Sequence, residues 1–356
     1  MLHKIITNGN NRFYRFGNAD GKRWVLPAQN MRVAFGLYQP SGIKGKMVKA
    51  LLPLLHRIPI MRRIIKAETL HCMLQRELRA LLCRLFGVQE IEFAIFEGTP
   101  CAHQKITMQL SCGKRILGYC KASDNPDILA LFEKESQTLQ HLADKGITNI
   151  PQALYCGTLR NGVHIFVQST KKSESSTSPH QWNDLHRQFL ASLHEKTRQT
   201  VLFEESDLYK SLAALQEHTG WLPACTDKQA VTNAIDSIMG KKCGEMVEFS
   251  AMHGDFTPWN MLVEEGDLFV FDFEYSALTC PPAFDAIHFA LQTAVFEQHM
   301  PKEEIAGMLL QEFEKEAVVM YLLDIISRFT MRENGPVKEN THLFAIWGYL
   351  LKEINC

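Results

Sequence analysis

The sequence predicts an α+β chain in which a small β-rich unit precedes a larger, mainly helical one. Before residue 170, apolar and polar residues often alternate as in strands, for example in "IEFAIFEG" and "HQKITMQLSCGKRILGYCKAS". After Trp182 the apolar residues mostly recur at helical spacing. Between the two regions lies a polar, serine-rich stretch, "KKSESSTSPHQ", which predicts a loop or hinge.

The bulk composition is that of a globular chain. With 356 residues, 46% of them hydrophobic, the chain can bury a substantial core and form two or three domains. No uninterrupted apolar run reaches the length of a membrane-spanning helix. The ten cysteines are scattered and form no CxxC pair, as in proteins of a reducing compartment. We therefore expect a cytoplasmic protein.

Positive charge is concentrated at the N-terminus. Up to Lys66 the chain carries thirteen lysines and arginines against the single acidic residue Asp20, although the net charge of the whole chain is −1. Such a region suits an anionic partner, and the basic stretch 44–66 could contact the inner face of a membrane. Nucleic acid is not favoured. Alternatively, the acidic remainder of the chain neutralises this region within the fold or in an oligomer.

The elements expected in the first half follow in order. Residues 1–40 are β-like and rich in turns, and residues 44–85 are helical with a break at Pro53 and Pro59 and an end at Gly87. Strands follow from residue 91. A helix is expected over "DILALFEKESQTLQHLADKG", and two short strands about an "RNG" turn over "IPQALYCGTLRNGVHIFVQST".

The second half contains one predicted hairpin that gathers polar residues. In "HGDFTPWNMLVEEGDLFVFDFE" two apolar segments flank a Glu265–Gly266 turn. Asn260 begins the first segment, Asp272 ends the second and Asp255 precedes both, so the three side chains could converge. Carboxylate and amide oxygens suit Mg²⁺, and a carboxylate that binds no metal can accept a proton. Phosphoryl transfer uses this division of labour.

Each of these residues also has a simpler interpretation. Asp255 could cap a short helix beginning at Thr257–Pro258, Asn260 could satisfy a turn, and Asp272 could pair with a lysine. All three would have to coincide at this spacing, which favours the shared site.

The motif "HGDFTPWN", followed by "DFE", resembles the HGDxxxxN and D-x-[DE] signature of the aminoglycoside phosphotransferase and choline kinase family. That family has a two-lobed, protein-kinase-like fold, with a small β-rich N-lobe and a larger helical C-lobe. The resemblance implies that Asp255 is the catalytic base and that Asn260 and Asp272 bind Mg²⁺. It further implies that His253 organises the loop, and that Asp285 of "PPAFDAIHFA" anchors it.

The same resemblance implies a nucleotide site in the β-rich unit. Lys121 would hold the ATP phosphates and pair with Glu135 of the following helix. The segment "VQST", which includes Gln168 and Ser169, would be the inter-lobe hinge whose backbone binds adenine. No GxGxxG loop is present, and only Gly98 stands where a phosphate-covering turn belongs.

These inferences predict a basic N-terminal extension at 1–85, an N-lobe at 86–170 and a C-lobe at 171–356. The expected function is an ATP- and Mg²⁺-dependent phosphotransferase acting on a hydroxyl of a small molecule. Because "HGDFTPWN" also resembles kinase-like proteins of bacterial cell-surface polysaccharide synthesis, a saccharide or lipid-linked saccharide is the favoured acceptor. Two alternatives remain. The weak phosphate loop favours a non-catalytic pseudokinase or scaffold, and the basic N-terminus favours a membrane-surface adaptor.

Overall fold

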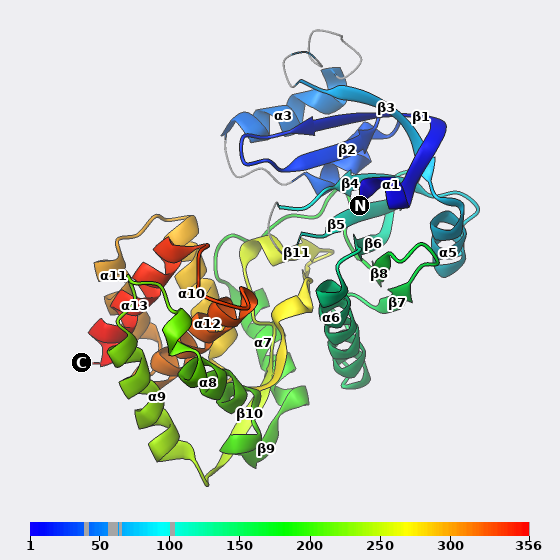
Figure 1. Cartoon of the computed structure of the whole chain (residues 1–356). Coiled ribbons are helices and arrows are strands. Elements are labelled where there is room, and N and C mark those ends of the chain that lie inside the picture. The colour runs from blue at the N-terminus through cyan, green and yellow to red at the C-terminus, as the bar shows by residue number, and fades with distance from the viewer. Residues whose placement is uncertain (39–42, 56–62, 64–65, 100–103, 356) are drawn as a thin grey trace. The chain divides into compact units, whose positions relative to one another are not determined.

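The computed structural model describes residues 1–38, 43–55, 63, 66–99 and 104–355. The chain divides into two compact units (Figure 1). The first unit comprises Met1–Ala143 with Ile150–Thr177, and the second comprises Asp144–Asn149 with Ser178–Cys356. The first unit is β-rich and the second mainly helical, so the predicted fold class is confirmed.

An antiparallel sheet of eight strands organises the first unit, in the order β3-β1-β2-β4-β5-β6-β8-β7. The strands are β1 (Ile6–Gly17), β2 (Arg23–Pro27), β3 (Glu68–Leu74), β4 (Glu92–Phe96), β5 (Ile106–Cys112), β6 (Arg115–Ser123), β7 (Ala153–Thr158) and β8 (His164–Ser169). The described helical segments are α1 (Leu2–Ile5), α2 (Met31–Ala34), η1 (Phe35–Leu37), α3 (Ile43–Leu55), α5 (Arg76–Phe86) and α6 (Pro126–Asp144).

Residues 68–74 correct one sequence prediction, because they form strand β3 where a helix was expected. Cys72 and Leu74 are buried while their neighbours are exposed, which is the two-residue period of a half-covered strand. The pairing partner is β1, which lies far away in the sequence, so local apolar spacing gave the wrong period. The following helix α5 ends at Gly87, which has a φ of 65°, as predicted.

Strands from both sides of the predicted boundary at residue 85 share this sheet, because β2 pairs with β4. The first 85 residues thus contribute directly to the sheet, and the three-part division of the chain stays a prediction. Of the predicted membrane-contacting stretch 44–66, residues 56–62 and 64–65 lie outside the described residues. None of the described helices has both the length and the apolar character needed to cross a membrane.

The second unit is built around α12, most of whose residues are buried. This helix packs against α8, α9, α10 and α13. The helical segments are α7 (Asp184–Thr197), η2 (Phe203–Glu205), α8 (Asp207–Glu217), η3 (Thr219–Trp221), α9 (Lys228–Lys242), η4 (Pro258–Asn260), η5 (Phe273–Tyr275), α10 (Phe284–Phe296), α11 (Lys302–Glu312), α12 (Lys315–Arg332) and α13 (Thr341–Asn355). The strands are β9 (Gln199–Leu202), β10 (Met246–Met252), β11 (Met261–Glu264), β12 (Asp267–Val270) and β13 (Ala277–Cys280).

Candidate functional site

The motif "HGDFTPWN" connects β10 to the hairpin of β11 and β12 and is almost entirely buried. Glu265 and Gly266 form the turn, with φ values of 53° and 90°. Two successive positive φ values are typical of a tight hairpin turn, so the predicted hairpin is confirmed. At the other end of the hairpin the amide of Phe271 donates to the carbonyl of Asn260 at 2.9 Å. Asn260 and Asp272 therefore flank the same end.

Asp285 fixes the start of this loop from α10. Its buried carboxylate accepts hydrogen bonds from the backbone N–H groups of His253, at 2.7 Å, and Gly254, at 2.9 Å. The ring of His253 donates from Nε2 to the carbonyl of Phe271, at 2.9 Å, and accepts at Nδ1 from the amide of Asp255, at 3.1 Å. These hydrogen bonds are those that residues supporting the loop would make. The structural roles of Asp285 and His253 stay predictions.

Gly254 and Arg328 hold the loop from the opposite side. Gly254 has a φ of 82°, and a Cβ at this position would lie 2.2 Å from the carbonyl oxygen of Tyr275. Only glycine fits there without displacement. Arg328 of α12 donates from Nη1 to the Gly254 carbonyl at 2.6 Å and from Nε to Asp324 at 2.8 Å. The loop is thus clamped between α10 and α12.

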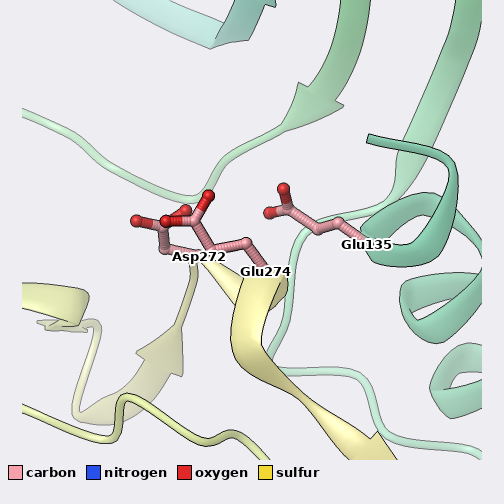
Figure 2. A group of neighbouring side chains, drawn as sticks. All are labelled: Glu135, Asp272 and Glu274. Atoms are coloured by element: carbon pink, nitrogen blue, oxygen red, sulfur yellow. The ribbon is translucent and has the colours of Figure 1, made fainter. Parts of the chain in front are cut away.

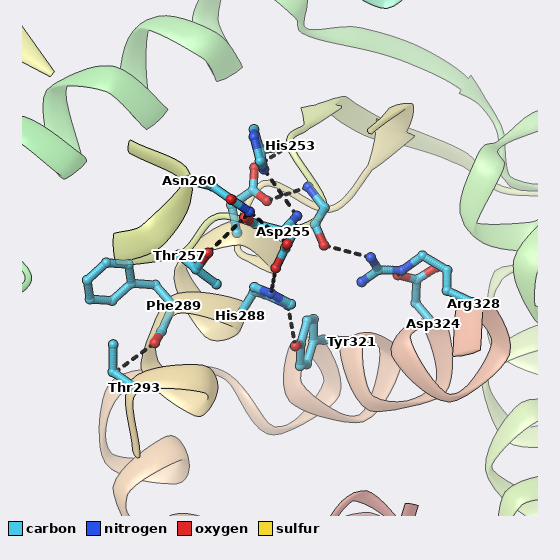
Figure 3. A network of polar contacts seen from close by, with 12 residues as sticks. His253, Asp255, Thr257, Asn260, His288, Phe289, Thr293, Tyr321, Asp324 and Arg328 are labelled. Carbon is cyan, nitrogen blue, oxygen red and sulfur yellow. Dashed lines mark hydrogen bonds and ion pairs between the residues drawn. The ribbon is translucent and has the colours of Figure 1, made fainter. Parts of the chain in front are cut away.

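Asp255 stands at the centre of this network (Figure 3). Its Oδ2 accepts from Nδ2 of Asn260 at 2.7 Å, and its Oδ1 accepts from Nε2 of His288 at 3.0 Å. The Nδ1 of His288 lies 2.8 Å from the hydroxyl of Tyr321. Burial raises the pKa of Tyr321, so this hydroxyl keeps its proton and can donate to Nδ1. The Nε2 proton of His288 is then directed at Asp255.

The structure excludes the simpler interpretation of Asp255 as a helix cap. The residue that precedes η4 as its N-cap is Thr257, so Asp255 is not the cap of that short helix. Burial raises the pKa of Asp255, but the hydrogen bond from His288 and the nearby imidazoles of His288 and His253 outweigh it. The net pKa of Asp255 lies below the ordinary aspartate value, and the carboxylate is ionised at neutral pH.

Asp272 lies at the start of η5 in a left-handed backbone conformation, with a φ of 72°. Figure 2 shows its carboxylate beside that of Glu274, and an oxygen of each lies within 4.8 Å of the other. Two carboxylates at this separation repel each other unless a cation compensates them. Asn260 directs its amide nitrogen at Asp255, which leaves its Oδ1 as a ligand atom of the kind that Mg²⁺ takes.

The first unit contains the predicted lysine–glutamate pair. Nζ of Lys121 on β6 lies 2.7 and 2.6 Å from the two carboxylate oxygens of Glu135 on α6, which Figure 2 also draws. Lys121 is 4% exposed and Glu135 is 0% exposed. A buried pair with this geometry satisfies both charges, which neither residue could tolerate alone.

The remaining predicted nucleotide residues also belong to the first unit. Ser169 ends β8, where its Oγ accepts from the amide of Gln152 at 2.9 Å. Gln168 is buried, and its Oε1 has no hydrogen-bond partner among the described residues. Gly98 has a φ of 87°, and a Cβ there would lie 2.3 Å from the carbonyl oxygen of Lys105. The rest of the predicted phosphate-covering turn, residues 100–103, lies outside the described residues.

Sequence reasoning missed His288, Tyr321 and Arg328. His288 had a usable signal, because it follows Asp285 by three positions and therefore shares its face of α10. Tyr321 and Arg328 are seven positions apart on α12, which indicates one helical face but does not say which loop that face meets.

Comparison with known proteins identifies the same family that the motif resembles. The model of the phosphotransferase enzyme family, APH, matches residues 124–314. A thermostable mutant of the aminoglycoside phosphotransferase APH(4)-Ia is 14% identical, with a TM-score of 0.51, and the match covers 78% of this chain and 97% of that one. Its ternary complex with ADP and hygromycin B is 13% identical, with the same coverage and a TM-score of 0.50.

The choline kinase LicA from Streptococcus pneumoniae is 14% identical with a TM-score of 0.49, and the match covers 79% of this chain and 98% of that one. Among curated proteins no match was found. At these identities the two aminoglycoside phosphotransferase structures show a shared fold.

Proposed function

Because the chain belongs to the phosphotransferase enzyme family and is therefore a small-molecule kinase, we propose that it uses ATP and Mg²⁺ to phosphorylate a hydroxyl of a saccharide or lipid-linked saccharide. The observation that carries this proposal is the arrangement of Asp255, Asn260 and Asp272 about one end of the hairpin. A scaffold protein would have no need for an ionised carboxylate held in this way.

Asp255 is proposed as the proton acceptor for the hydroxyl. Its two oxygens receive one side-chain hydrogen bond each, from Asn260 and His288, and a carboxylate has about four acceptor positions. It therefore retains capacity to accept from a substrate hydroxyl. The donors fix the direction of the carboxylate, and such preorganisation favours the reacting geometry.

Asn260 and Asp272 are proposed as Mg²⁺ ligands, with Glu274 as a further acidic residue beside them. The donor set fits this ion, because it consists of an amide oxygen and carboxylates whose mutual repulsion a cation would relieve. When bound, Mg²⁺ neutralises charge on the phosphate oxygens. Asp255 is less suited to ligate the ion, because His288 and Asn260 already direct protons at its oxygens.

ATP is the proposed donor. In the first unit, Lys121 is held by Glu135 and presents an ammonium group for phosphate oxygens. The buried Oε1 of Gln168, which has no partner within the part of the chain that the structure describes, costs free energy that a donor group on a bound nucleotide would recover. The ADP complex of the related aminoglycoside phosphotransferase supports an adenine nucleotide at this kind of site.

Helix α3 favours an additional membrane-contacting function. Its side chains of Met47, Leu51 and Leu54 are 57%, 40% and 76% exposed, and their spacing places them on one helical face. The same unit contains an open cavity lined by Arg12, Arg63, Lys66, Ala67, Glu68, Thr69 and His71. We expect co-sedimentation with phosphatidylglycerol vesicles that Leu54→Asp abolishes. Equal binding of wild type and variant would remove this role.

The proposed function is tested by thermal shift with ATP, with and without Mg²⁺, on the wild type and on Asp272→Asn. A ligand at about a hundred times its dissociation constant stabilises a protein by about 2.7 kcal/mol. We expect a shift that requires Mg²⁺ and is lost in Asp272→Asn but kept in Asp267→Asn, a control in the same hairpin. A shift without Mg²⁺ that is unchanged in Asp272→Asn would contradict the metal assignment.

A further inference from the structure

Trp259 is unusual within the loop that contains Asp255. Its neighbours Pro258 and Asn260 are buried, whereas Trp259 itself is 37% exposed. Exposing a large aromatic ring in an otherwise buried loop forgoes hydrophobic stabilisation, because Trp side chains bury large apolar areas in cores and interfaces. This exposure indicates a surface that contacts something else.

A second exposed ring lies beside it. Phe296 ends α10, is 43% exposed, and meets the ring of Trp259 edge to face with 6.2 Å between the ring centroids. The next residue, Glu297, accepts a hydrogen bond from Nδ1 of His180 at 2.8 Å. The Trp259–Phe296 pair and the His180–Glu297 pair therefore both lie at the C-terminal end of α10, and Trp259 directly precedes Asn260, whose Nδ2 donates to Asp255.

We propose that Trp259 and Phe296 form the acceptor subsite and that their ligand is a pyranose ring; this deepens the proposed function and rests on it. A pyranose presents a face of C–H groups that packs on aromatic rings and an edge of hydroxyls that hydrogen-bond to polar groups. Trp259 and Phe296 would pack on the C–H face of the sugar. The carboxylate of Glu297 and the imidazole of His180 would hydrogen-bond to its hydroxyls.

Other occupants fit these residues less well. A protein partner would bury about 800 Å² on each side, far more than two rings offer. An acyl chain has no groups that could hydrogen-bond to Glu297 and His180. A pyranose held by Trp259 would lie on the loop that carries Asp255, because Trp259 directly precedes Asn260, which donates to Asp255.

The test titrates methyl β-D-glucopyranoside, methyl α-D-mannopyranoside and N-acetyl-D-glucosamine while tryptophan fluorescence is recorded, with choline chloride and glycerol as non-pyranose probes. We expect a saturable change with at least one pyranose, which Trp259→Phe abolishes although the other four tryptophans remain. Phe296→Leu keeps Trp259 and should raise the dissociation constant of the same pyranose by at least about fivefold, or about 1 kcal/mol. Leu310→Ala, another exposed apolar position, should bind like the wild type.

The outcomes separate the two levels of the proposal. A protein that shows the Mg²⁺-dependent ATP shift but responds to no pyranose, or responds only to choline, would overturn the saccharide subsite and leave the kinase assignment intact. An unchanged titration in Phe296→Leu would overturn it as well. A folded protein without the ATP shift would refute the proposed function itself.

Discussion

Two polar arrangements can be compared, one in each unit. In the first unit, Lys121 and Glu135 meet in a closed pair, in which both carboxylate oxygens lie within 2.7 Å of a single ammonium. In the second unit, Asp255 is bonded by an amide and an imidazole, and the imidazole is bonded in turn by Tyr321. The first arrangement cancels charge, whereas the second orients a carboxylate and leaves it ionised.

The difference explains why each suits its proposed role. A closed ion pair positions an ammonium but makes both partners dependent on each other for stability. A carboxylate that accepts hydrogen bonds from an amide and an imidazole is held in one direction, and its remaining acceptor positions can still receive a proton. Mutation should therefore affect folding most in the first arrangement and turnover most in the second.

The largest expected effect on stability is that of Lys121→Met. It removes from the buried carboxylate of Glu135 the ammonium that lies 2.6 and 2.7 Å from its oxygens, which costs about 3–5 kcal/mol in comparable pairs. Urea unfolding measures the loss. The double variant Lys121→Met with Glu135→Gln should recover most of it while nucleotide binding stays weak. A single variant as stable as the wild type would show that the pair contributes nothing to folding.

His288→Ala should affect turnover rather than folding. We expect the rate of phosphoryl transfer to fall by about 10- to 100-fold, or about 1.4–2.7 kcal/mol, because Asp255 loses one of the two donors that orient it. The pKa of Asp255 should also rise, because the hydrogen bond that lowers it is gone. The acidic limb of the pH–rate profile should then move to higher pH.

Two comparisons sharpen this result. His288→Gln retains a donor and should recover part of the rate, and Tyr321→Phe removes only the outer hydroxyl and should cost less, about 1 kcal/mol. If His288→Ala raised the KM for ATP without moving the pH profile, His288 would be a structural residue and not a positioning one.

The smallest expected effect concerns a titratable group outside both arrangements. Burial lowers the pKa of His186 to about 4 from its ordinary 6.5. Between these values the unfolded chain binds more protons than the folded one, so stability should decrease as the pH falls from 6.5 to 4. The melting temperature of His186→Gln should depend less on pH over this window. An equal dependence in both proteins would assign it to other groups.

Features formed by residues close together in the sequence could be predicted, whereas features formed by residues far apart in the sequence could not. The hairpin, its Glu265–Gly266 turn and the Lys121–Glu135 pair followed from local patterns and from the family resemblance. Strand β3 was missed because its pairing partner is remote, and helical spacing in a short apolar segment is ambiguous. Tyr321 and Arg328 were missed because helical spacing in the sequence does not identify the loop against which a helix face packs.

The most direct test of the central claim compares Asp255→Asn with the wild type in ATP hydrolysis, with water as the acceptor, and in Mg-ATP affinity. The account predicts a loss of turnover of about 10²–10⁴-fold with an Mg-ATP dissociation constant within about threefold of the wild type, because Asp255 accepts a proton and does not bind the metal. If Mg-ATP binding weakened as much as turnover, Asp255 would be a metal ligand and the proposed division of labour would be wrong.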